Sequence, residues 1–278
     1  MEIFKTRAQL ALCLDALRRS GKSIGLVPTM GALHSGHLSL VDAAKKQTDV
    51  VICSIFVNPT QFNDPADLEK YPRPVDEDIQ KLNLICDVLF MPEVNEMYAP
   101  DESWSIDLGR LELVLEGQFR PGHYQGVTQI VKKLFDAVKP DKAFFGQKDF
   151  QQFKIIELMM RQLHIPVELV MCPIIREADG LAMSSRNVHL SPAEHSQALA
   201  LSKTLSFVQQ HFQSRSIAEL NKTASQMLAD SSGIELDYFQ ICDADTLEPV
   251  TNKTSKGIIA LIAARVGNTR LIDNIILQ

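Results

Sequence analysis

Residues 27–37, with the sequence VPTMGALHSGH, join two stretches of different periodicity. Residues 24–27 are apolar and end at Pro28, which is typical of a short buried strand. From residue 37 to 47 apolar residues recur at helical spacing, with Ser35 as the expected N-cap. A strand that passes through glycines into a helix directs backbone N–H groups and the positive end of the helix dipole at one point. The segment therefore predicts a phosphate-binding turn within an α/β fold.

Strand-like and helix-like stretches alternate along the chain as far as residue 171. The apolar run 50–57, VVICSIFV, is continuous, as in parallel strands that are covered on both faces. Further strands are expected at 87–91, 143–145 and 167–171, and helices at 6–20, 76–84, 127–138 and 150–163. The alternation predicts βαβ units and a Rossmann-like, doubly wound parallel sheet. Ligands bind at the carboxyl ends of such strands, so the loops 28–37, 58–62 and 146–152 should converge.

Beyond residue 175 the pattern changes to long helices followed by strands. Helices are expected at 192–213 and 217–230, and strands at 236–241, 257–263 and 271–277. We therefore expect a Rossmann-like domain over residues 1–175. A smaller α+β domain over residues 176–278 should close over the site as a lid.

The composition argues against several classes of protein. A chain of 278 residues with 22% charged residues can bury a core and is not of disordered composition. Its formal net charge of −6 argues against broad nucleic-acid binding. The five cysteines are scattered without a CxxC spacing, as is typical of reduced thiols, and no signal or membrane-spanning pattern occurs. We expect a cytoplasmic protein without a nucleic-acid or membrane partner.

Two histidines, His34 and His37, stand three positions apart at the start of the expected helix. The spacing of Gly31 and Gly36 is that of a P-loop. However, His37 and Leu38 stand where that motif needs Lys and Ser or Thr. Imidazoles donate to phosphate oxygens, so the His-x-Gly-His pattern suits a nucleotide site. Two incidental histidines or a zinc pair are alternatives, although no acidic third ligand accompanies them.

A second polar segment, MSSRN, occupies residues 183–187. A guanidinium flanked by hydroxyls suits a triphosphate, because Arg makes paired hydrogen bonds to phosphate oxygens. Alone, such a loop is most often solvated surface. Together with His-x-Gly-His, it resembles the HIGH and KMSKS signatures of class I nucleotidyltransferases and aminoacyl-tRNA synthetases, here with Arg in place of the usual final Lys-Ser.

Further motifs are similar to those of one family in this superfamily. They are VPTMGALHSGH (27–37), SIFVNPTQF (54–62), YPR (71–73), RPGHYQGV (120–127), FGQKDFQQ (145–152), AMSSRN (182–187), DADTL (243–247) and ARVGNTRLIDN (264–274). In this order they resemble the pantothenate synthetase, or pantoate–β-alanine ligase, family over nearly the whole chain. The resemblance implies an AMP-forming ligase that joins (R)-pantoate to β-alanine through a pantoyl-adenylate, with ATP and Mg²⁺, in a homodimer.

The resemblance also implies roles for individual residues. The implied catalytic residues are His34, His37, Lys148 and Arg186. The implied ATP contacts are Met30, Gly31, Ala32, Leu33, His34, Ser35, Gly36, His37, Gly146, Gln147, Lys148, Asp149, Ile175, Met183, Ser184, Ser185 and Arg186. Among them, His37 would be the proton donor, Lys148 would reach the α-phosphate and Asp149 the ribose hydroxyls.

The substrate and metal assignments rest on the same resemblance. Gln61 and Gln152 would hold pantoate, with Gln61 also near β-alanine, since an amide both donates to and accepts from hydroxyls. Asp78 would contact Mg²⁺, although an ordinary solvated helix face, shared with Asp76 and Glu77, is an alternative. His123 is given a minor role at most.

Two functions of other classes remain open at this point. A nucleotidyltransferase such as a cytidylyltransferase would share His-x-Gly-His but would release a nucleotide-linked acceptor instead of AMP. A catalytically silent protein would bind ATP without exchanging pyrophosphate. An aminoacyl-tRNA synthetase is disfavoured by the acidic charge balance and by the lack of an anticodon-binding extension.

Overall fold

The computed structural model describes residues 1–63 and 65–278, which form two compact units. The first unit comprises Met1–Gly146 and Gln151–Pro173, and the second Gln147–Phe150 and Ile174–Gln278. The sequence placed the boundary after residue 175 and assigned 147–150 to the first domain. The compact units change at residues 173–174 and group 147–150 with the second unit, while the domain division expected from the sequence stays a prediction.

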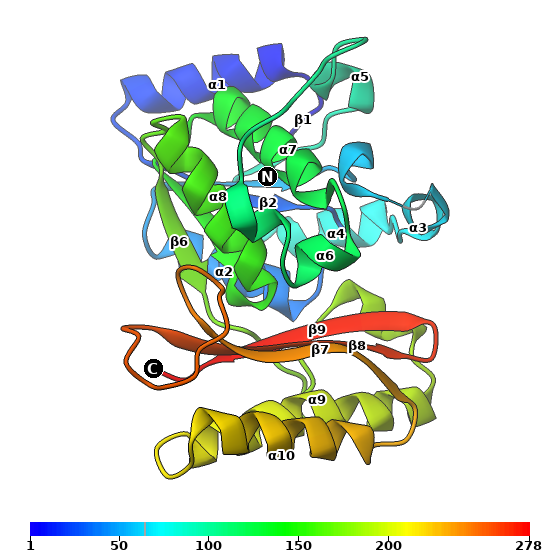
Figure 1. Ribbon diagram of the computed structural model, residues 1–278. Coiled ribbons are helices and arrows are strands. Elements are labelled where there is room, and N and C mark those ends of the chain that lie inside the picture. Colours follow the sequence, from blue (N-terminus) through cyan, green and yellow to red (C-terminus); the bar gives the residue numbers. More distant parts are fainter. Residues whose placement is uncertain (64) are drawn as a thin grey trace. The chain divides into compact units, whose positions relative to one another are not determined.

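A six-stranded sheet forms the centre of the first unit, in the order β1-β4-β3-β2-β5-β6 (Figure 1). The strands are β1 Glu2–Phe4, β2 Ile24–Thr29, β3 Val50–Ile55, β4 Val88–Phe90, β5 Lys142–Gly146 and β6 Glu168–Cys172. All neighbours pair in parallel. The order reverses between β2 and β5, which is the switch point where doubly wound sheets bind ligands. The predicted fold class is confirmed, while the edge strand β1 was not expected.

Helices cover both faces of this sheet because side chains alternate along its strands. Leu26 and Ile52 pack in one core with α1 Arg7–Arg19, α7 His123–Val138 and α8 Phe150–Gln162. Val27 and Val51 pack on the other face with α2 Ser35–Lys45 and α4 Val75–Leu82. The remaining short helices are η1 Pro59–Gln61, α3 Pro65–Lys70, α5 Val94–Met97, η2 Gly109–Glu112 and α6 Glu116–Phe119. Strands buried on both faces explain the continuous apolar runs.

The second unit has an antiparallel sheet in the order β7-β8-β9. Its strands are β7 Ile234–Asp243, β8 Ile258–Val266 and β9 Thr269–Ile276, and its helices are η3 Gln147–Asp149, η4 Ser185–His189, α9 Pro192–His211 and α10 Ile217–Ala229. Leu205 of α9 and Leu220 of α10 share one core with Ile262 of β8. Two long helices against one sheet give the α+β architecture expected from the sequence.

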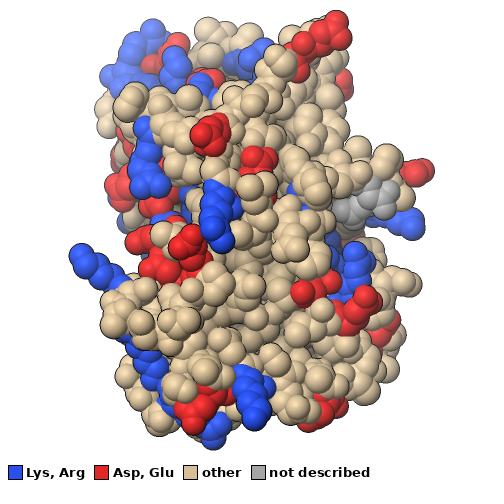
Figure 2. Space-filling view, viewed as in Figure 1, with Lys and Arg blue, Asp and Glu red and all other residues tan. Residues whose placement is uncertain are grey.

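The surface and the thiols add three facts. Among the described residues on the face in Figure 2, basic and acidic side chains are interspersed and form no broad basic area. Within residues 1–63 and 65–278, no helix combines the length and the apolar character needed to cross a bilayer. All five cysteines are free, as expected from their scattered spacing, and four of them are buried.

Candidate active site

The turn after β2 has an unusual backbone. Gly31 has φ +80°, and Ala32, with φ +50°, also lies in the left-handed region. A Cβ on Gly31 would lie 3.0 Å from Oδ2 of Asp78 and 3.1 Å from Cγ2 of Ile55. The turn therefore needs glycine at position 31 both for its φ and for its close packing.

The carboxylate of Asp78 holds this turn. The backbone N–H groups of Ala32 and Leu33 donate to its two oxygens, Oδ2 and Oδ1, at 2.7 Å each. Asp78 is only 1% exposed, and Lys81 Nζ donates to the carbonyl of Leu33 at 2.9 Å. Hydrogen bonds to an ionised group are the strong ones. The structure thus gives Asp78 a role in shaping the turn, and its contact with Mg²⁺ stays a prediction.

His34 and His37 cap the helix α2. Nδ1 of His34 accepts from the N–H of Gly36 at 3.1 Å, and Nδ1 of His37 accepts from the N–H of His34 at 3.4 Å. The ring centroids lie 4.1 Å apart. A backbone N–H can only donate, so each Nδ1 carries a lone pair and each neutral ring carries its proton on Nε2. The helix begins at Ser35 with His34 as N-cap, two residues before the expected start.

A buried amide, Asn58, organises the segment that follows β3. Its Nδ2 donates to the side-chain oxygen of Gln61 at 3.2 Å and to the carbonyl of Gly126 at 3.0 Å. Its Oδ1 accepts from the hydroxyls of Tyr98 at 2.6 Å and Thr60 at 3.2 Å. Burial raises the pKa of Tyr98 to about 12, so this hydroxyl keeps its proton. Asn58 is fully satisfied and fixes the orientation of the Gln61 amide.

Gln61 lies against the turn after β2. Its Nε2 donates to Sδ of Met30 at 3.0 Å, so the structure brings two of the predicted site residues together. The carbonyl of Gln61 accepts from Nδ1 of buried His123 at 2.8 Å. The minor role expected for His123 is therefore to support the backbone of Gln61.

Gln152 lies half-buried in the first turn of α8. Its neighbour Gln151 is buried and spans α8 and the preceding loops. Gln151 donates to the carbonyls of Leu111 at 2.7 Å and Val114 at 2.8 Å, and accepts from the N–H of Glu116 at 3.0 Å. Of the two adjacent glutamines, Gln151 has the structural role, and pantoate binding by Gln152 stays a prediction.

In the second unit, η3 carries the predicted ATP residues Gln147, Lys148 and Asp149. Asn274 of β9 donates through Nδ2 to the carbonyls of Gln147 at 3.0 Å and Lys148 at 2.9 Å. Its Oδ1 accepts from Nε2 of Gln147 at 3.0 Å. The backbone that carries Lys148 is therefore fixed from β9.

The MSSRN segment follows a short hairpin in the same unit, in which Arg176 pairs with Ala182. The N–H of Met183 donates to the carbonyl of Ile175 at 3.0 Å, which joins two predicted ATP residues. Oγ of Ser184 accepts from the N–H of Arg186 at 3.2 Å and caps η4. The hydroxyl of Ser184 thus shapes the loop that presents Ser185 and Arg186.

A paired arginine anchors this hairpin to β9. Arg176 donates to Asp273 through two nitrogens, at 2.7 Å and 3.0 Å, and to the carbonyl of Gly180 at 3.1 Å. Burial raises the pKa of Asp273, and the Arg176 guanidinium opposes that rise. A buried carboxylate is held in place here by a bidentate partner.

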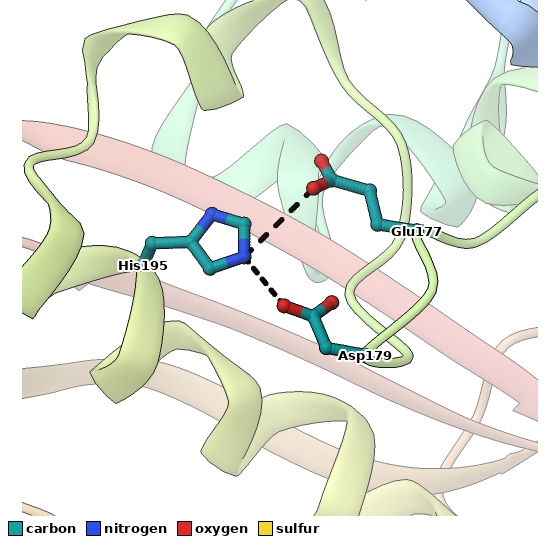
Figure 3. Close-up of side chains that lie close together, drawn as sticks. All are labelled: Glu177, Asp179 and His195. Atoms are coloured by element: carbon teal, nitrogen blue, oxygen red, sulfur yellow. Dashed lines mark hydrogen bonds and ion pairs between the residues drawn. The ribbon is translucent and has the colours of Figure 1, made fainter.

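Three side chains of the kinds that ligate metals lie close together beside the same hairpin. The side chains of Glu177, Asp179 and His195 point toward one another (Figure 3), with Nε2 of His195 2.7 Å from Asp179 and 3.8 Å from Glu177. Neighbouring ligands around a tetrahedral ion with bonds of about 2.0–2.1 Å lie more than ~3 Å apart. The 2.7 Å contact is instead a hydrogen bond, and it lowers the pKa of Asp179. Glu177 also accepts from Nδ2 of Asn187 at 2.6 Å, which ties the cluster to the MSSRN segment.

Comparison with known proteins decides the family. The sequence profile of pantoate-β-alanine ligase matches residues 2–276. The chain belongs to the pantoate–β-alanine ligase family. The pantothenate synthetase of Bacteroides thetaiotaomicron is 47% identical over 277 residues, covering 99% of this chain and 98% of that protein. The pantothenate synthetase of Thermotoga petrophila is 46% identical over 282 residues, covering both proteins completely.

Solved structures of the family have the same fold. The pantothenate synthetase of Thermus thermophilus superposes with a TM-score of 0.94 at 39% identity, covering 100% of this chain and 99% of that chain. A pantoate-β-alanine ligase of Francisella tularensis, in complex with "Beta-gamma ATP" and β-alanine, gives a TM-score of 0.82 at 35% identity. That comparison covers 100% of this chain and 98% of the other.

Sequence reasoning missed three polar groups that shape these segments. Asn58 lay within a recognised motif, and its position just after a buried strand was a usable signal. Asp78 was assigned to Mg²⁺ from the resemblance, with a solvated helix face as the alternative. That alternative is wrong because Asp78 is buried, and helix spacing alone did not reveal that its carboxylate faces the turn at residues 32 and 33. Asn274 ended another recognised motif, but its partners at residues 147 and 148 are distant in sequence.

We expect Asp78→Asn to destabilise the protein and to weaken ATP binding. An amide accepts at one end only, so one of the two backbone N–H groups loses its partner. A hydrogen bond to a charged group contributes about 1.5–3 kcal/mol. Urea unfolding should show a loss of this size, and KM for ATP should rise. Asp76→Asn, on the exposed side of the same helix, is the matched control. A changed Mg²⁺ requirement with unchanged stability would instead support the metal role.

We expect Gly126→Ala to displace Gln61 and so to weaken the binding of pantoate. The added Cβ would lie 2.3 Å from the carbonyl oxygen of Thr60 and 2.7 Å from the nitrogen of Gln61, both backbone atoms. Overpacking of this kind costs about 1–3 kcal/mol. In steady-state kinetics KM for pantoate should rise more than KM for ATP, because Gln61 contacts the ATP turn only through the side chain of Met30. An unchanged KM for pantoate would show that Gln61 does not bind that substrate.

Proposed function

We propose that the chain condenses (R)-pantoate with β-alanine in an ATP-dependent reaction that yields pantothenate, AMP and pyrophosphate. The observation that carries this proposal is membership of the pantoate–β-alanine ligase family over residues 2–276. A relative of 35% identity, crystallised in complex with "Beta-gamma ATP" and β-alanine, supports these two molecules as substrates.

The reaction proceeds through a pantoyl-adenylate. The pantoate carboxylate attacks the α-phosphorus of ATP and pyrophosphate leaves. The amine of β-alanine then attacks the acyl carbon, AMP leaves and the ammonium proton is lost. The Nε2–H groups of His34 and His37, fixed by the caps at Nδ1, donate to phosphate oxygens. Lys148 and Arg186 supply positive charge, which stabilises the negative charge that develops at the α-phosphate during the attack.

The metal would be carried by the nucleotide. Mg²⁺ usually keeps several waters and binds through substrate phosphates and one or two carboxylates. Both oxygens of Asp78 already accept from the turn, so this carboxylate fits poorly as a direct ligand. No step of the reaction above is therefore assigned to a protein-bound metal. A homodimer is part of the proposal and rests on the family resemblance. A cytoplasmic location rests on the scattered cysteines, and a lid role for the C-terminal unit rests on the position of the MSSRN segment after the sheet domain.

Isotope exchange tests the adenylate. Labelled pyrophosphate should enter ATP when pantoate is present and β-alanine is absent, because the first step is reversible and does not use the amine. Omitting pantoate is the control. Exchange that strictly requires β-alanine would exclude the two-step route, and a nucleotide-linked acceptor as product would identify a nucleotidyltransferase instead.

Two alanine variants separate binding from chemistry. Lys148→Ala should lower kcat by about 10²–10³-fold with a smaller effect on ATP binding, since its charge acts mainly in the transition state. His37→Ala should behave similarly if His37 donates to the leaving pyrophosphate, but should raise KM for ATP alone if it grips the ground state. Lys142→Ala, the same change on β5, is the control. A near-normal kcat in Lys148→Ala would show that Lys148 does not act at the α-phosphate.

A further inference from the structure

The segment Gln147–Phe150 follows β5 directly and ends with the first residue of α8, yet it groups with the second unit and not with the sheet unit that flanks it. We propose that Asn274 and the Arg176–Asp273 pair are positioning residues for the reaction. They join Lys148 and the MSSRN segment, residues 183–187, into one piece of the C-terminal unit. The proposal rests on the function proposed above for its assignment of Lys148 and Arg186 to ATP.

Asn274 directs its whole side chain at one segment. Both of its amide hydrogens go to backbone carbonyls, of Gln147 and Lys148, and its oxygen takes the amide of Gln147. Asn274 is 2% exposed, so water does not replace these partners easily. Without Asn274 the carbonyls of Gln147 and Lys148 lose this donor, and the segment would shift to recover one. Among the described residues, Asn274 therefore determines where the Lys148 backbone lies.

The preceding residue on β9, Asp273, holds the other segment. Its two oxygens accept from Arg176, which begins the hairpin that leads to residue 183. Arg176 pairs across that hairpin with Ala182, and the N–H of Met183 follows with its bond to Ile175. Two adjacent residues of one strand thus fix the start of the MSSRN segment and the backbone of Lys148.

This linkage matters because Lys148 is expected to act at the α-phosphorus. A displacement of about 1 Å can cost roughly 10²-fold in rate. Asp273 and Asn274 are adjacent on β9, so the backbone of Lys148 and the start of the hairpin that leads to Arg186 are held in a fixed relative position. Asp273 and Asn274 thus act on the proposed reaction through the segments that they hold.

A double-mutant cycle tests the positioning role. Asn274→Ala should lower kcat by about 10²-fold while KM for ATP changes less. If Asn274 acts through Lys148, Asn274→Ala combined with Lys148→Ala should be no slower than Lys148→Ala alone. Losses that multiply in the double variant would overturn the proposal. Asn252→Ala removes an exposed asparagine of the same unit and should leave kcat unchanged.

Hydrogen exchange gives a readout that does not need catalysis. In Asn274→Ala the amides of residues 147–150 should exchange faster, while those of the turn at residues 31–34 keep their rates. Unchanged exchange in 147–150 would also overturn the proposal. Asn274→Asp keeps the side-chain volume but turns an oxygen toward two carbonyls, so it should reproduce the defect if the alanine variant folds poorly. Pyrophosphate exchange by the wild-type enzyme is measured first, so that a failure of the proposed function is recognised separately.

Discussion

The two hydrogen bonds from backbone N–H groups to the carboxylate of Asp78 are the interaction on which the turn after β2 depends. Gly31 and Ala32 both adopt positive φ, a conformation that an alanine adopts only when its surroundings hold it there. The two 2.7 Å hydrogen bonds from the turn to one buried carboxylate provide that support. The position of this turn determines where α2 begins, and therefore where His34 and His37 lie. A side chain on α4 thus determines the geometry of a helix start that is more than forty residues earlier.

The second unit uses the same device with different chemistry. Asn274 holds two backbone carbonyls where Asp78 holds two backbone N–H groups. In both places a polar side chain is buried to fix an irregular segment that follows a parallel strand, β2 in one case and β5 in the other. Such segments lack the ladder of a sheet, so buried polar partners must satisfy their backbone groups. Burying a polar group costs free energy unless that group is hydrogen-bonded. Asp78 and Asn274 are therefore buried only where irregular backbone needs partners, and both of these segments are proposed to bind ATP.

The sequence predicted what depends on local pattern. The continuous apolar run at 50–57 became β3, and the glycine-containing stretch after residue 27 became a turn into a helix. The start of α2 was placed two residues late, because a histidine cap is outside the usual set of capping residues. The role of Asp78, the edge strand β1 and the grouping of 147–150 with the C-terminal unit depend on partners distant in sequence. A single sequence read by period and motif does not contain those pairings.

The two units make different contributions to the proposed chemistry. In the first unit, Nδ1 of His34 and Nδ1 of His37 each accept a backbone N–H, which leaves the Nε2–H groups at the start of α2 as the donors proposed for phosphate. The permanent cations assigned to ATP, Lys148 and Arg186, both belong to the second unit. Neutral donors hold a ground-state triphosphate adequately, whereas charge that develops at the α-phosphorus is stabilised by cations. On the proposed assignment, the permanent positive charge that stabilises the transition state comes from residues of the second unit.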